Sequence, residues 1–442
     1  MSEYLAGRAQ MGTSLAFHIV FAMLGVGLPV MMLIVEGIGL RSGNQEWLRL
    51  ARRWSSAFGV LFAVGAVSGT VLSFELGLLW PGFMGFAGGI IGLPFSMEGF
   101  AFFIEAIFLG LYLYGWGRLP ARVHWLCTIP LAVSGGASAW FVTTANAWMN
   151  SPTGFRLDNG RVTDIHPLQA IFNPGTGIET THTMISAYVA TGFAVAAVYA
   201  IGILRGRPGG LYRKGLLVGM IVGSIGTPLS VITGDLNARW VADNQPAKLA
   251  AMEGVFKTES GAPLRIGGLP DLQSRETKYA IEIPAGLSFL AYGNPSATVR
   301  GLDSFPPGTT PDPRPVHLAF DIMVAIGFAL LGLAAWFFIA LWRKRSVPEG
   351  RLLLWAIGAS GFLSFVAMEA GWMVTEIGRQ PWIIYGVVRT AAAITPAPGL
   401  VVSFIVSTII YILLAVVCAG LLLHQAAITR KGVEPEVHEE PV

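Results

Sequence analysis

The chain has 442 residues, of which 53% are hydrophobic and 12% are charged. A soluble domain usually carries about 25% charged residues, so the composition excludes an ordinary soluble protein and predicts an all-α polytopic membrane protein embedded in a lipid bilayer. The net charge of +3 gives no reason to expect a nucleic-acid partner. The two cysteines, Cys127 and Cys418, lie in apolar segments, which excludes a disulfide framework and a thiolate metal site.

Windows of about 20 apolar residues predict about nine transmembrane helices. In chain order they lie near residues 13–40, 55–79, 92–115, 123–147, 180–204, 214–235, 318–342, 352–376 and 400–424. The first window is long and follows neither a basic segment nor a small-residue cleavage site. We therefore interpret it as a retained helix rather than a signal peptide.

Basic residues gather in alternate connections between these windows. The positive-inside rule places such connections in the cytoplasm, so we expect the N-terminus outside and the C-terminus in the cytoplasm. The basic connections contain Arg41, Arg49, Arg52, Arg53, Arg118, Arg122, Arg205, Arg207, Arg213, Lys214, Arg343, Lys344, Arg345, Arg351, Arg430 and Lys431.

The same pattern divides the chain into four parts. These are helices 1–6 in residues 1–235, an outer loop in 236–317, helices 7–9 in 318–428 and an acidic tail in 429–442 that we expect to be disordered. An unstructured loop as long as 236–317 is unusual, which predicts that this loop is folded. Within it, Lys248-Leu-Ala-Ala-Met-Glu253 predicts a short amphipathic helix, and Lys278-Tyr-Ala-Ile-Glu-Ile-Pro284 predicts a strand or the start of a helix.

Ionisable residues at the end of the eighth window stand out from their apolar surroundings. Glu369 and Glu376 lie one heptad apart, on roughly one face of the helix, and Arg379 and Trp382 follow. Trp382 and Arg379 are also typical of an interfacial anchor, but an anchor does not explain the two carboxylates. Ionisable groups within a membrane are costly and usually functional.

Metal-ligating and acidic side chains in five predicted helices fall at a similar depth near the outer side. They are His18, Glu98, Glu105, His182, Met323 and Glu376. This agreement predicts one shared cofactor region. Read singly, each has a simpler interpretation: Met323 as apolar packing, the histidines as hydrogen-bonded groups, and Glu98 and Glu105 as a structural pair or a proton path.

The ligand types favour haem over other metal cofactors. A His and Met pair suits a low-spin haem, whereas a single His with an open sixth position suits a haem that binds oxygen. A zinc or di-iron site would favour a Glu-x-x-His pattern on one helix, which the sequence lacks. His124, His424 and His438 lie at the cytoplasmic side and are interpreted as non-ligands. We expect His166 and His317, in the outer loops, to be solvated, with a role at a haem propionate or in proton exit as the alternative.

Several motifs in this order resemble subunit I of the cytochrome bd-type quinol oxidases, with a short quinol loop. The resemblance covers most of the chain, from Arg8-Ala-Gln10 to Trp382. The longest and most specific motif is Gly371-Trp372 with Gly378-Arg379-Gln-Pro-Trp382. The shorter motifs are Glu98-Gly-Phe-Ala-Phe-Phe-Ile-Glu105, Ala145-Asn-Ala-Trp-Met149, Thr181-His182-Thr183, Lys248-Leu-Ala-Ala-Met-Glu253 and Ile322-Met323-Val324.

The resemblance implies a haem-containing respiratory oxidase of the bacterial cytoplasmic (inner) membrane, which oxidises quinol, reduces O2 to water and generates a proton motive force without pumping. It implies a low-spin haem b, a high-spin haem b and a haem d or third haem b. It also implies a second, subunit II-like membrane subunit and allows a small accessory subunit.

The resemblance also implies roles for single residues. His182 and Met323 would ligate the low-spin haem, and His18 and Glu376 the two high-spin haems. Glu98 would be a ligand or proton donor, with Glu105 leading into a proton path. Trp372 would lie between haems, Arg379 would hold propionates, and Lys248 and Glu253 would bind and deprotonate quinol.

One position departs from the family pattern. Asp321 stands where well-known members carry Arg, and an anion near the low-spin haem predicts a lower midpoint potential, because it favours the ferric state. This departure keeps open a related oxidoreductase with another electron donor or acceptor, such as nitric oxide. A transporter is the more distant alternative, since buried carboxylates also carry protons or cations.

Overall fold

The structure, a computed structural model, describes residues 1–207 and 209–430. Within these residues nine helical segments are long and apolar enough to cross a membrane, which confirms the predicted polytopic helical fold. They are α1 (Glu3–Ser42), α2 (Gln45–Leu79), α3 (Pro81–Gly115), α4 with α5 (Ala121–Leu126 and Thr128–Asn150), α7 (Thr176–Leu204), α8 (Gly210–Asn244), α11 (Pro313–Lys344), α12 (Arg351–Gly378) and α14 (Leu400–Arg430).

The helices extend beyond the apolar windows because capping residues, rather than hydropathy, determine where they begin. The Ser2 hydroxyl accepts from the Leu5 amide at 3.3 Å, and the Asn44 side chain accepts from the Glu46 amide at 2.9 Å. Asp312 caps α11 in the same way, directly before Pro313. The second helix therefore begins ten residues before the predicted 55. The predicted tail lies mostly outside the described residues.

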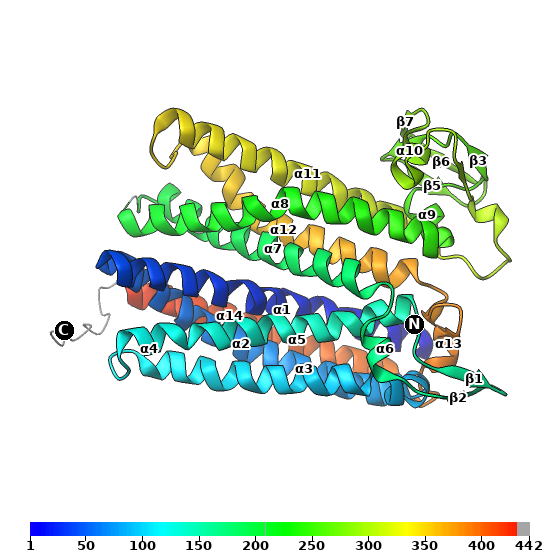
Figure 1. Cartoon of the computed structure of the whole chain (residues 1–442), viewed down its shortest axis with the longest axis horizontal. Helices are drawn as coiled ribbons and strands as arrows, with labels where there is room; N and C mark the ends of the chain where they lie inside the picture. The colour runs from blue at the N-terminus through cyan, green and yellow to red at the C-terminus, as the bar shows by residue number, and fades with distance from the viewer. Residues whose placement is uncertain (208, 431–442) are drawn as a thin grey trace.

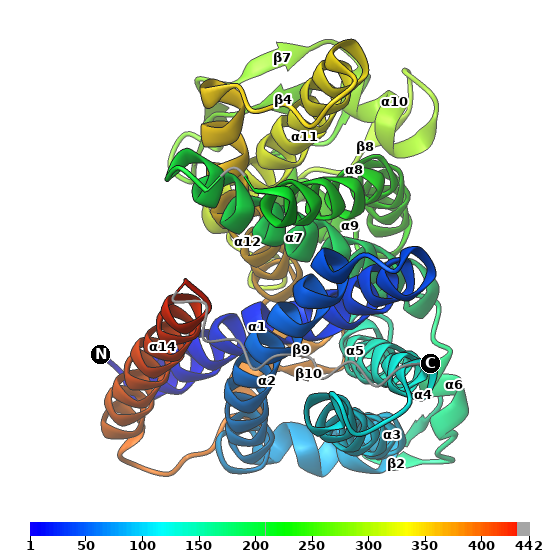
Figure 2. The ribbon, with the colours of Figure 1, turned by 90° about the vertical axis from the view of Figure 1, so that its left-hand side faces the viewer.

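The spanning helices lie roughly side by side in two groups with α1 between them (Figures 1 and 2). One group contains α7, α8, α11 and α12, in which α7 packs on α8 and α12, and α11 packs on α12. The other contains α2, α3, α5 and α14, in which α3 packs on α5, and α1 packs on both α2 and α14. Helix α1 also packs on α7, so a site between α1 and either group draws residues from distant parts of the chain.

The segment that joins α8 to α11, residues 245–312, is folded, as predicted. We call it the α8–α11 segment; it is shorter than the predicted 236–317 because both flanking helices continue past their apolar windows. It lies at the end of the molecule where the N-terminus also lies (Figure 1). It contains α9 (Pro246–Met252), β3 (Glu259–Ser260), β4 (Leu264–Ile266), β5 (Leu269–Asp271), β6 (Glu276–Lys278), β7 (Ile281–Ile283), α10 (Gly286–Tyr292), β8 (Thr298–Val299) and the 3-10 helix η1 (Leu302–Ser304).

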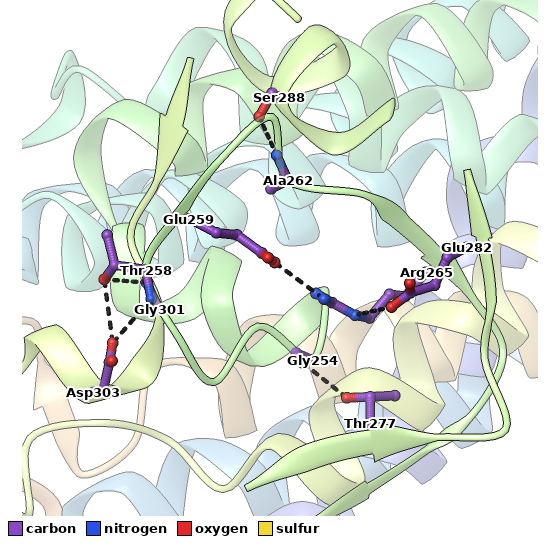
Figure 3. Close-up of polar contacts among 10 residues, drawn as sticks. All are labelled: Gly254, Thr258, Glu259, Ala262, Arg265, Thr277, Glu282, Ser288, Gly301 and Asp303. Carbon is purple, nitrogen blue, oxygen red and sulfur yellow. Dashed lines mark hydrogen bonds and ion pairs between the residues drawn. The ribbon is translucent and has the colours of Figure 1, made fainter. Parts of the chain in front are cut away.

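Three short antiparallel strand pairs, β3 with β8, β4 with β7 and β5 with β6, give this segment its shape. Arg265 on β4 ties two of them together, since it donates to Glu259 and to Glu282, each at 3.0 Å (Figure 3). The Thr277 hydroxyl donates to the Gly254 carbonyl at 2.7 Å, which joins β6 to the turn after α9.

Helix α9 corrects one prediction. It forms where a helix was expected, but it is not an amphipathic surface helix, because every residue from Ala247 to Met252 is buried. Helices α8, α11 and α12 pack on α9, so the side that the sequence pattern assigns to water is covered. For residues 278–284 the sequence predicted a strand or the start of a helix, and the structure has strands there, β6 and β7.

The remaining short elements lie at the same end of the molecule as the α8–α11 segment (Figure 1). They are the hairpin β1 (Arg156–Asp158) and β2 (Arg161–Thr163), α6 (Pro167–Ile171), the pair β9 (Trp382–Ile384) and β10 (Val388–Arg389), and α13 (Thr390–Ala393).

Candidate functional site

A cavity of about 1100 Å³ lies between α7, α8, α11, α12 and the α8–α11 segment. It brings together five of the residues singled out in the sequence: His182, Lys248, Glu253, Met323 and Trp372. They come from three spanning helices and the α8–α11 segment, which together span almost 200 residues of sequence. The lining is mostly apolar, with few polar groups, which is the usual character of a site for a large, flat organic molecule.

His182 on α7 has one ring nitrogen committed and one available. Its Nδ1 lies 3.0 Å from the Thr233 hydroxyl, which itself donates to the Leu229 carbonyl at 2.9 Å. Because that hydroxyl hydrogen is used, Nδ1 is the donor to Thr233, and Nε2 keeps its lone pair. A histidine that ligates a metal is usually oriented in this way by a partner on its other nitrogen.

His18 on α1 repeats the arrangement outside the cavity. Its Nδ1 lies 3.0 Å from the Ser68 hydroxyl on α2, and that hydroxyl donates to the Val64 carbonyl at 3.0 Å. Nε2 of His18 is therefore also left with its lone pair. A Cβ at Gly69 would come within 2.9 Å of the imidazole, so this close approach of α1 to α2 requires glycine.

Met323 lies on α11 against α12. A Cβ at Gly371 would lie 3.0 Å from the Met323 sulfur, so the glycine lets the thioether approach the α12 backbone. Within residues 1–207 and 209–430, no three His, Cys, Asp or Glu side chains gather as an ordinary metal site would require. A thioether and an imidazole on one wide cavity instead suit the axial positions of a haem.

The buried Arg379 and the partly buried Glu376 form a polar network at the end of α12. The two Glu376 oxygens accept from the Asn146 amide at 2.5 Å and from the Arg379 guanidinium at 2.6 Å. Arg379 also donates to the Asn150 side chain at 3.1 Å. Its Nε is buried without a hydrogen-bond partner, which fits an additional acceptor such as a carboxylate. Glu369, seven residues before Glu376, also has a buried carboxylate oxygen without a hydrogen-bond partner.

Glu98 and Glu105 lie on α3 facing α5, away from the cavity. Glu98 accepts from the Ser138 hydroxyl at 3.4 Å. Glu105 is only 5% exposed, and a Cβ at Gly135 would lie 3.1 Å from its carboxylate. Small residues on α5 thus make room for a carboxyl group within the bundle.

Lys248 and Glu253, by contrast, face the large cavity from the α8–α11 segment. Burial raises the pKa of the Glu253 carboxyl to about 8, with the Asp321 anion adding to the rise and Arg265 opposing it. Burial also lowers the pKa of the Lys248 ammonium to about 8, against the attraction of Glu179. A carboxyl and an amine with pKa values near neutrality, both facing a cavity, are typical of proton-transfer sites.

His317 corrects another prediction, because it is not solvated. It is fully buried within α11, and both ring nitrogens contact backbone carbonyls, those of Met252 and Gly267. Its partners lie 65 and 50 residues earlier in the chain, so no local pattern could reveal them. His166 is exposed and pairs with Asp164 at 2.9 Å.

Two buried carboxylates in spanning helices were not predicted. Glu75 accepts from Gln10 at 2.8 Å and from Ser14 at 2.9 Å. Glu36 accepts from Tyr112 and lies 2.6 Å from His124, so His124 is a hydrogen-bonded core residue. Both acids lie inside the apolar windows 13–40 and 55–79, and that placement was the signal available in the sequence.

Comparison with known proteins agrees with this geometry. The model of the family "Cytochrome bd terminal oxidase subunit I" matches residues 6–430. A Bacillus subtilis (strain 168) protein assigned provisionally as a cytochrome bd menaquinol oxidase subunit I is 36% identical over 96% of both chains. The cytochrome bd ubiquinol oxidase subunit 1 of the same organism is 31% identical over 100% of this chain and 96% of its own. The bd oxidase from Geobacillus thermodenitrificans superposes with a TM-score of 0.91 and 38% identity, over 96% of this chain and 98% of that one.

Fold and site together define a membrane-bound haem oxidoreductase of a bacterial respiratory chain. The chain belongs to the cytochrome bd terminal oxidase subunit I family. It is therefore a subunit of a haem-containing quinol:O2 oxidoreductase of the bacterial inner membrane, and it acts with a second subunit.

Proposed function

We propose that His182 and Met323 are the axial ligands of a low-spin haem b within the large cavity, next to the quinol site. The observation that carries this assignment is their shared cavity with Lys248 and Glu253, combined with the His182 hydrogen bond to Thr233, which leaves Nε2 available for iron. When bound, the haems supply one-electron transfer and oxygen reduction. The chain's own residues provide ligation, spacing and proton transfer.

His18 and Glu376 are the proposed ligands at the two high-spin haems, a haem b and either a haem d or a third haem b. The same hydroxyl arrangement leaves Nε2 of His18 available, as at His182. Glu376 is held in place by Asn146 and Arg379, and the unpartnered Nε of Arg379 suits a haem propionate. Trp372 lines the cavity and also packs against the buried cluster that contains Ile19 of α1, which supports a position between haems.

Quinol binds in the cavity mouth, where Lys248 holds a quinol oxygen and the Glu253 carboxylate accepts its proton. The α8–α11 segment and the N-terminus lie at one end of the molecule and the basic connections at the other, so that proton is released outside. Protons for water formation come from the cytoplasm and reach Glu98 through Glu105. The two proton movements use opposite sides, so the reaction generates a proton motive force without a pump.

The assembly contains a second, subunit II-like membrane subunit, with room for a small accessory subunit. Exposed apolar side chains on α3, among them Phe100, Phe103 and Ile107, and many on α14 support a face covered by lipid or by these partners.

Replacing the proposed ligands of the high-spin haems should abolish oxygen reduction. We expect His18→Ala and Glu376→Ala to remove quinol-dependent oxygen uptake in membranes, because each deletes a donor atom to iron. His166→Ala is the matched control, since His166 is exposed and pairs only with Asp164, and it should keep wild-type uptake. Retained uptake in both ligand variants would contradict the assignment.

Met323→Leu should remove the low-spin signal selectively. Leucine has a similar volume but no sulfur, so the low-spin haem loses one axial ligand while packing is preserved. The measurement is a reduced-minus-oxidised spectrum with pyridine haemochrome analysis, which also counts the haems and reveals a chlorin. Met97→Leu, at an exposed methionine of α3, should leave the spectrum unchanged. An intact low-spin band in Met323→Leu would exclude Met323 as a ligand.

A further inference from the structure

His317 and Asp321 lie one helical turn apart on α11, where the α8–α11 segment meets the spanning helices. His317 is 0% exposed, and its Nε2 lies 3.3 Å from Asp321 Oδ2. Asp321 lines the large cavity two residues before Met323. A lone anion in this place would be costly to bury, so its charge needs a partner.

The hydrogen bonds of His317 define its charge. Nδ1 lies 2.7 Å from the Met252 carbonyl oxygen, and Nε2 lies 3.1 Å from the Gly267 carbonyl oxygen. A carbonyl oxygen can only accept, whereas a neutral imidazole has a single N–H to donate. Both bonds are made only if both nitrogens carry hydrogen, which makes the ring an imidazolium and Asp321 its counter-ion.

The two carbonyl partners also determine what His317 holds together. Met252 directly precedes Glu253, and Gly267 follows Arg265 by two residues. Arg265 is itself fixed between Glu259 and Glu282, as Figure 3 shows, and lines the same cavity as Glu253. A single buried side chain therefore attaches both segments that carry cavity-facing charges to the helix that carries Met323.

We propose that His317 is a positioning residue: a buried imidazolium that clamps the Glu253 and Arg265 segments onto α11 and neutralises Asp321 beside the low-spin haem. This inference rests on the function proposed above for Glu253 and Met323. The inference changes the midpoint potential expected for the low-spin haem when Asp321 is considered without a partner. The haem faces a neutral pair rather than a free anion, so the Asp at this position lowers the midpoint potential less than an unpaired carboxylate would.

The test compares the complete purified oxidase with His317→Gln, Asp321→Asn and the double variant. Spectroelectrochemical titration of the low-spin haem is the first readout. We expect a downward shift in His317→Gln, where Asp321 becomes unpaired, an upward shift in Asp321→Asn, and a value near wild type in the double variant. A neutral His317 predicts instead no shift in His317→Gln, and equal shifts in Asp321→Asn and the double variant; either result overturns the proposal.

Hydrogen exchange in residues 246–267 is the second readout and does not depend on the haem potential. Loss of one buried hydrogen bond corresponds to about tenfold faster exchange through local opening. We expect that increase in His317→Gln and not in Asp321→Asn; no increase overturns the clamp. If His317→Gln alone does not assemble, the comparison of Asp321→Asn with the charge-neutral double variant still decides the charge. If Met323→Leu loses the low-spin band while His317→Gln keeps the wild-type midpoint potential, this inference is refuted and the proposed function remains supported.

Discussion

Replacing Glu253 by Gln is expected to lower the turnover number for quinol oxidation by about 10²-fold to 10⁴-fold, the usual contribution of a positioned general base. Glu253 is 5% exposed and faces the cavity, so no solvent-exposed base can easily replace it. Gln keeps the size and one acceptor oxygen but cannot accept a proton. The loss should therefore appear in kcat, with KM changed little, in oxygen-uptake assays over a range of quinol concentrations.

Glu276→Gln is the matched control. Glu276 lies in β6 of the same segment but is exposed, so the same change of charge there should leave kcat near the wild-type value. A wild-type kcat in Glu253→Gln would show that another group accepts the quinol proton.

The pH dependence follows from the two pKa values near 8. Glu253 accepts a proton only when deprotonated, so kcat/KM should rise with pH until about 8, where its raised pKa lies. Lys248 loses its charge above about 8, so its hold on the quinol oxygen should weaken and activity should fall again. A narrow, bell-shaped optimum near pH 8 is expected, and Glu253→Gln should lose the acidic limb.

Hydropathy alone was sufficient to predict the number and approximate position of the spanning helices, because each must bury an apolar stretch about as long as the bilayer is thick. Hydropathy did not predict the residues at which these helices begin and end. The second helix begins at Gln45 because Asn44 caps it, although the next ten residues are too polar to enter the apolar window. The intrahelical hydrogen bonds of such a turn do not need lipid, so the helix continues into the aqueous layer.

The candidate site was predictable where ligand chemistry is unusual in a membrane, and not where burial depends on distant partners. His18, His182 and Glu376 stand out as polar residues in apolar helices. The α8–α11 segment gives no such contrast, since its sequence predicts short elements but not which of their side chains are buried. His317 contacts the carbonyls of Met252 and Gly267, and α9 packs on α11 and α12, which come later in the chain; those contacts arise only when the segment folds over the cavity.

The second large effect is expected at Arg379, where Arg379→Gln should destabilise the protein by about 1–3 kcal/mol, the usual cost when buried hydrogen-bonding groups lose a partner. Arg379 is 1% exposed and neutralises Glu376, so its removal leaves the partly buried Glu376 carboxylate with one fewer donor. Thermal unfolding of the solubilised oxidase and its haem content measure the loss, since a displaced Glu376 should also bind haem less well. Arg389→Gln is the matched control, because Arg389 is exposed and stacks on Trp382 at 5.2 Å.

Arg379→Gln has a second, purely electrostatic consequence. The Arg379 guanidinium contributes to the lowered pKa of Lys248, so its removal should raise that pKa and move the alkaline limb of the pH profile to higher pH. General unfolding would reduce activity at every pH without moving the limb, whereas the loss of a nearby cation moves the limb in one direction. If Arg379→Gln is as stable as Arg389→Gln and the limb does not move, Arg379 is not part of the charge network that joins Glu376 to the quinol site.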